Sequence, residues 1–66
     1  MIDPLSAEIA EALLDVRSPT FGDAIRLTRK RLPVATDEYR TRVANGAAYV
    51  YYDTLSIIKR VLYGKI

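Results

Sequence analysis

The chain contains no proline after Pro33, and this absence constrains its fold more than any other feature. Thr36 can act as an N-cap, and two acidic residues follow it in the first turn, where the helix dipole favours negative charge. Helix-compatible residues then continue to Gly64, where we expect a left-handed C-terminal cap. The sequence therefore predicts one helix over residues 37–63, about 40 Å long at 1.5 Å per residue.

Proline and capping residues also delimit two shorter helices before the long one. Asp3 followed by Pro4 is typical of a helix start, and Pro19 ends that helix because the residue before a proline disfavours the α region. Thr20 can cap a second helix, which Pro33 stops. The predicted fold is a single all-α domain over residues 1–66, with helices at about 4–15, 21–32 and 37–63.

The 66 residues include no cysteine, histidine or tryptophan. A core this small rarely supplies more than about 3–5 kcal/mol without a further stabilising element. The missing cysteine excludes a disulfide, and the missing cysteine and histidine together exclude nearly every zinc site. We therefore expect no metal and no cofactor, and good helix packing or a partner chain must supply the stability.

Catalysis is not expected from this composition. General acid–base work near neutral pH most often uses histidine, and the most reactive nucleophile is cysteine; the chain has neither. The serines lack an adjacent base, and the three isolated glycines form no phosphate-binding loop. The sequence predicts a non-enzyme and indicates no small-molecule substrate.

One side of the long helix is aliphatic and is predicted to be the intramolecular core face. Its members are Tyr39, Val43, Ala47, Val50, Thr54, Ile57, Ile58 and Val61. Two helices of about 12 residues could cover this stripe only by packing end to end along it. Otherwise part of the long helix must contact another chain.

A run of small residues, Gly46-Ala47-Ala48, lies midway along the long helix. Small side chains permit close approach of another helix backbone. That helix could be the second one of the same domain, which is the simpler interpretation, or a helix of a partner. Gly46 could also produce a weak kink.

The opposite side of the long helix carries a second, near-heptad series that should face water. Its members are Asn45, Tyr49, Tyr52, Ser56, Lys59 and Tyr63. Tyrosine combines an apolar ring with a polar tip and is enriched at protein interfaces. We expect a protein interface at Tyr49, Tyr52, Ser56, Lys59 and Tyr63, unless the short helices extend far enough round to cover these rings.

Charge is distributed unevenly along the chain. Residues 1–25 carry five acidic side chains and one basic one, whereas residues 26–66 carry nine basic and three acidic ones. The simplest interpretation places the acidic helix against the basic ones within one domain. The alternatives are an anionic partner or head-to-tail self-association.

Six cations near the second helix connection favour a second hypothesis, a helix-turn-helix-like DNA-binding regulator. They are Arg26, Arg29, Lys30, Arg31, Arg40 and Arg42. Two features oppose it: Asp37 and Glu38 would face the phosphates, and the connection contains no glycine. Nucleic acid is therefore the less favoured partner.

No apolar run approaches the roughly 20 residues that cross a bilayer, and the first residues lack the basic and apolar regions of a signal peptide. We expect no membrane span and a cytoplasmic location. The leading hypothesis is a small regulatory or interaction protein without catalytic activity. It would bind another protein chain, or a second copy of itself, through the long C-terminal helix.

Overall fold

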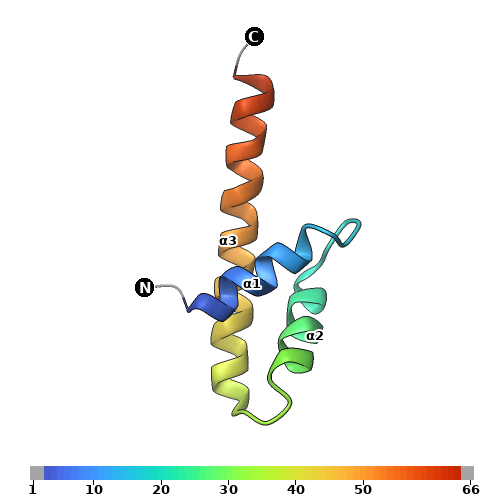
Figure 1. Ribbon diagram of the computed structural model, residues 1–66, viewed down its shortest axis with the longest axis vertical. Helices are drawn as coiled ribbons and strands as arrows, with labels where there is room; N and C mark the ends of the chain where they lie inside the picture. Colours follow the sequence, from blue (N-terminus) through green and yellow to red (C-terminus); the bar gives the residue numbers. More distant parts are fainter. Residues whose placement is uncertain (1–2, 65–66) are drawn as a thin grey trace.

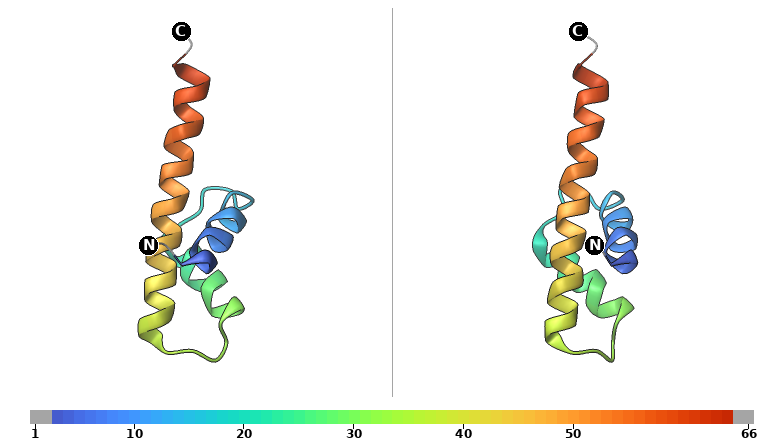
Figure 2. Two further views of the ribbon diagram at one scale, coloured as in Figure 1. Left: turned by 60° about the vertical axis from the view of Figure 1, so that its left-hand side comes forward. Right: turned by 90° about the vertical axis from the view of Figure 1, so that its left-hand side faces the viewer.

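The computed structural model describes residues 3–64 and consists of three helices. They are α1 (Pro4–Leu13), α2 (Phe21–Arg31) and α3 (Asp37–Tyr63). The all-α prediction is confirmed, and residues 3–64 contain no strand. Helix α2 runs back in the opposite sense to α3 and is inclined to it, and α1 crosses α3 obliquely (Figures 1 and 2). The longest dimension, 47 Å, follows α3.

The predicted N-caps are confirmed at all three helices. The side chains of Asp3 and Thr36 accept backbone N–H groups from the first turns of α1 and α3, at 2.9 and 3.1 Å. At α2, Thr20 and Asp23 form a reciprocal capping box: each side chain accepts the other residue's backbone N–H. These bonds satisfy N–H groups that a helix start leaves unpaired, which explains why local sequence located the starts correctly.

The helix ends differ slightly from expectation. Helix α1 ends at Leu13 rather than near residue 15, because the next three backbone N–H groups bond to carbonyls three residues back and tighten the chain. The predicted left-handed cap at Gly64 is wrong. Gly64 has φ −73°, in the right-handed region, and its N–H bonds to the carbonyl of Arg60 at 2.7 Å, so it continues the helical pattern.

The core lies where both short helices meet the first half of α3. Ala44 and Ala47 are almost completely buried, against Ile9 and Leu13 of α1 and Ala24 of α2. The small residues of α3 thus mark a crossing inside the domain, as the simpler interpretation held, but the crossing helix is α1 as well as α2. Helix α3 continues through the crossing without a break.

Two buried hydroxyls are paired with backbone carbonyls. Ser6 of α1 donates to the carbonyl of Val43 in α3 at 3.0 Å, and Thr28 donates to the carbonyl of Ala24 at 2.7 Å. Within residues 3–64 no buried side-chain nitrogen or oxygen lacks a partner. The first bond joins α1 to α3, and it satisfies the Ser6 hydroxyl where the two helices pack against each other.

The predicted intramolecular core face holds only for the first half of α3. Val43 and Ala47 are buried, whereas Ile57, Ile58 and Val61 are exposed, so the prediction is wrong for the second half. Both further views show α1 and α2 beside the lower part of α3, with the upper part standing clear of them (Figure 2). The short helices pack beside each other and not end to end, so they cover one half of the stripe.

Two capping carboxylates couple the fold to pH. The Leu5 backbone N–H and the Tyr39 hydroxyl both donate to Asp3, so the pKa of Asp3 lies below its usual value. The Thr20 backbone N–H and the Arg26 guanidinium lower the pKa of Asp23 in the same way. A carboxylate with a lowered pKa in the folded state stabilises the fold above its unfolded pKa, and this stabilisation is lost as pH falls through the folded value.

We therefore expect the thermal unfolding midpoint to be highest near neutral pH and to fall most steeply below about pH 4. Circular dichroism melts between about pH 7 and pH 2 measure this. The double variant Asp3→Asn/Asp23→Asn should melt lower at neutral pH and show a shallower acid dependence. An equally steep fall in the double variant would assign the effect to other carboxylates.

Candidate interaction surface on the long helix

The second half of α3 extends beyond the rest of the domain. We call residues 56–63 the projecting segment; every residue in it is exposed. Its continuation from the core-forming half is visible as the orange and red part of the helix in Figure 1. The first half of α3 packs against α1 and α2, whereas the side chains of the projecting segment remain accessible to another chain.

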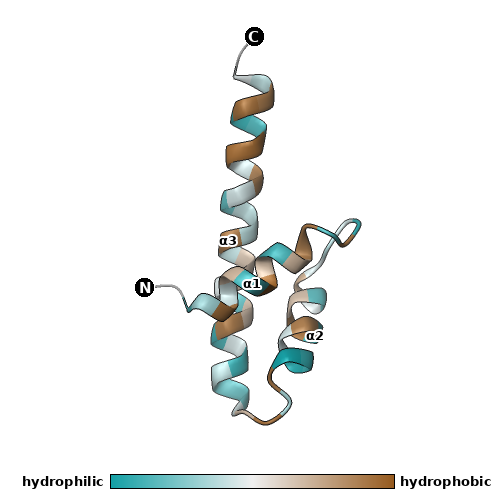
Figure 3. Ribbon diagram, in the orientation of Figure 1, coloured by the Kyte–Doolittle hydropathy of each residue, from teal (hydrophilic) through white to brown (hydrophobic). Residues whose placement is uncertain are grey.

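One side of the projecting segment is aliphatic. Ile57, Ile58, Val61 and Leu62, here called the aliphatic face, are 59%, 42%, 56% and 64% exposed. At 100° per residue, Ile57, Ile58 and Val61 lie within about 60° of the direction of the buried Val43, and Leu62 lies at the edge of that side, so the face prolongs the core stripe out of the domain. Hydrophobic colouring returns along the upper helix, far from α1 and α2 (Figure 3).

The other side carries the series predicted from sequence, here called the tyrosine face. Its members Tyr49, Tyr52, Ser56, Lys59 and Tyr63 are all exposed, so the short helices do not cover them. Phe21, at the start of α2, lies beside this face and was not among the residues predicted to form it. Phe21 is 45% exposed and lines a surface hollow with Tyr49 and Tyr52. Its exposure could have been expected from its position as the first residue of α2, because a side chain at the end of a helix is covered on fewer sides by neighbouring helices.

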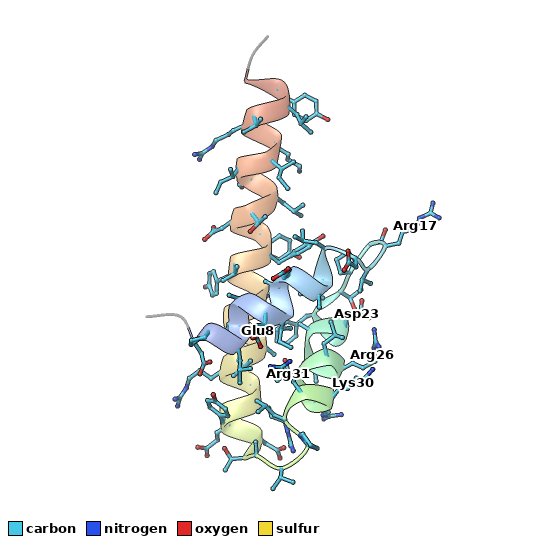
Figure 4. The ribbon with its side chains drawn as sticks, in the orientation of Figure 1. Glu8, Arg17, Asp23, Arg26, Lys30 and Arg31 are labelled. Carbon is cyan, nitrogen blue, oxygen red and sulfur yellow. The ribbon has the colours of Figure 1, made fainter. Side chains whose placement is uncertain are left out.

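Three of the six predicted nucleic-acid contacts form ion pairs within the domain. The Arg26–Asp23 and Arg40–Asp37 pairs are 3.2 Å long, and Arg31 reaches Glu8 of α1 at 2.6 Å. Glu8 and Arg31 approach each other from neighbouring helices in Figure 4. The acidic first helix was expected to lie against the basic ones, and among the described ion pairs only Glu8–Arg31 joins α1 to another helix.

Arg40 also has a structural role that sequence analysis did not identify. Its guanidinium donates to the carbonyls of Leu32 and Pro33 at 2.7 and 2.8 Å, where α2 ends. These carbonyls follow the last turn of α2, where acceptors are otherwise left without partners. Arg40 therefore ties the α2–α3 connection to α3 and is not a free cation.

The remaining three cations, Arg29, Lys30 and Arg42, are exposed and make no ion pair within residues 3–64. In a helix-turn-helix the two helices meet at about 90–120°. Here α2 runs back toward the start of α3 in Figure 1, and Figure 2 shows that it is also inclined across α3. This arrangement does not test the DNA-binding hypothesis, which stays a prediction.

Within residues 3–64, no three acidic side chains gather in a group that could hold a metal ion. Over the same residues, no helix combines the length and apolar character needed to cross a membrane. Comparison with models of protein families, with curated proteins and with solved structures found no match.

Proposed function

We propose that this protein is a non-catalytic helical interaction protein that binds another polypeptide chain through the second half of α3. In this proposal α1 and α2 form a small body that holds one end of α3, and the projecting segment is the docking element. The single observation that carries the proposal is the aliphatic face, which continues the core stripe but has no cover from α1 or α2.

The amount and placement of apolar surface support docking. A solvent-exposed helix of a folded domain is usually polar on the side that faces water, whereas a helix apolar on several sides is normally buried. The projecting segment exposes Ile57, Val61 and Leu62 on one side and Tyr63 on the other, each by more than half of its area. Contiguous apolar surface of this kind marks interaction sites in soluble proteins.

The two faces contribute different chemistry to the proposed interface. The aliphatic face supplies surface that is favourable to bury, about 25 cal/mol per Å² removed from water. The tyrosine face adds rigid rings whose hydroxyls can stay hydrated at a polar rim, with Lys59 beside them. We assign the anchor to the aliphatic face and the rim to the tyrosine face.

Site-specific photo-crosslinking in the cells that make the protein tests this proposal. A photoreactive amino acid at Val61 should give a discrete crosslinked product, and one at Tyr52 should give the same product if the rim also contacts the partner. The control position is Glu38, exposed at the opposite end of α3. The proposal fails if Val61 gives no discrete product, or only the products seen from Glu38.

A further inference from the structure

Four residues of α3 follow the alternating spacing of a coiled-coil seam. Val50, Thr54, Ile57 and Val61 recur at intervals of four, three and four residues, which places them at successive a and d positions of a heptad. Val50 and Thr54 are half-buried beside the body, and Ile57 and Val61 are more than half exposed. The seam therefore begins at the body and continues into the projecting segment.

The polar member of this seam can be buried without an unpaired hydroxyl. Thr54 donates its hydroxyl to the carbonyl of Val50, one turn earlier, at 2.8 Å. The hydrogen bond is internal to α3, so it would survive the arrival of another helix. Only the methyl group of Thr54 then needs to pack against a partner.

The two edges of the seam differ in chemistry. One edge carries Asp53 and Arg60, each directly before a seam residue and seven residues apart, at g positions. The other edge carries Tyr51 and Ile58, each directly after a seam residue, at e positions. Asp53 and Arg60 are exposed, and neither makes an ion pair or side-chain hydrogen bond within residues 3–64.

These edges discriminate between the two ways of pairing identical helices. In a parallel pair the g edge of one helix meets the e edge of the other, which would place the Asp53 carboxylate against Ile58. In an antiparallel pair, g meets g and e meets e. Asp53 then faces Arg60 of the second copy, twice by symmetry, and Ile58 lies toward Tyr51, which is half-buried against Leu13, Ala24 and Ala44 of its own domain. Residues at e and g set orientation in coiled coils, and here they favour the antiparallel one.

We propose that the occupant of this surface is a second copy of the same chain, paired antiparallel along residues 50–61 of α3. The inference rests on the proposed function and names its partner. Val50 lies beside Val61 of the second copy, and Thr54 lies beside its Ile57. The overlap of 12 residues is about 18 Å long. The two bodies lie at opposite ends of it, because α1 and α2 lie beside only the first half of α3.

Charge reversal tests the pairing directly. Sedimentation equilibrium of the purified chain from about 1 µM to about 1 mM should show a monomer–dimer equilibrium. The single variants Asp53→Arg and Arg60→Asp should each raise the dimer dissociation constant about tenfold, because each turns two attractions into two repulsions. The double variant Asp53→Arg/Arg60→Asp should restore dimerisation, and a mixture of the two single variants should form heterodimers. Glu38→Arg, at the body end of α3, is the matched control and should change nothing.

Disulfide trapping tests the orientation independently, since the chain has no cysteine of its own. Mixing Val50→Cys with a size-tagged Val61→Cys under oxidising conditions should give mainly the mixed disulfide. A parallel pair would instead give the two like-with-like products and would overturn the inference. A chain that stays monomeric throughout, or a double charge variant that fails to restore dimers, also overturns it. If the purified chain is monomeric while Val61 crosslinks a different protein in cells, self-pairing fails but the proposed function stands.

Discussion

Replacing Leu13 with alanine is expected to unfold most of the protein at room temperature. Leu13 is 2% exposed and packs with Ala24 and Ala44, so it touches both of the other helices. Truncating a buried leucine to alanine destabilises proteins by about 2–5 kcal/mol, through lost burial and the cavity left behind. A core of this size supplies only about 3–5 kcal/mol in total, so most of the stability disappears with one side chain.

The adjacent residue provides a matched control. Leu14 is 46% exposed and follows the last residue of α1. The change Leu14→Ala should therefore alter stability by no more than about 0.5 kcal/mol. Urea unfolding followed by circular dichroism compares the two variants under one set of conditions. Equal effects of the two substitutions would show that α1 does not pack on α3 through Leu13.

The second large effect is expected from filling the helix crossing. Ala47 has no exposed surface and lies against Ile9 of α1 and Val43 of its own helix. In Ala47→Leu the larger side chain must push α1 away from α3. Such overpacking destabilises by about 1–3 kcal/mol, and displacement of α1 would also stretch the bond from Ser6 to the carbonyl of Val43.

The same substitution at an exposed alanine isolates this steric effect. Ala7 lies on the outer side of α1, so Ala7→Leu adds the same atoms where there is room. Its thermal midpoint should match that of the unaltered protein, whereas Ala47→Leu should melt markedly lower in circular dichroism. If Ala47→Leu melts at the unaltered temperature, α1 does not cross α3 at this point.

Helix number and boundaries were predictable because they depend on local chemistry. The starts at Asp3, Thr20 and Thr36 are capped by side chains within three residues, and α2 ends at Arg31, two residues before Pro33. The least accurate boundary, the end of α1, depends on a turn in which several hydrogen-bond patterns compete. The misjudged Gly64 cap shows the same limit, because a terminal glycine can adopt the right-handed conformation as well as the left-handed one.

The candidate site was predictable in part. Periodicity placed the tyrosine face on the side away from the core, and its exposure agrees with that. Periodicity also assigned Ile57, Ile58 and Val61 to the core, since a helical pattern identifies a face but not how far along the helix that face is covered. The assignment of Arg40 to a nucleic-acid surface failed to anticipate its carbonyl partners, which come from the connection that precedes α3.

Sequence by itself thus determined the three helices, their order and the apolar side of each, because caps, prolines and periodicity act within a few residues. Tertiary structure decided which half of α3 is buried. The small residues Ser6, Ala44 and Ala47 let α1 approach one short stretch of α3, and α2 packs beside it over the same half. Helices of 10 and 11 residues gathered at one crossing cannot also reach the far end of a helix of 27. The aliphatic face is left uncovered for this reason, and it is there that we expect a second copy of the chain to bind.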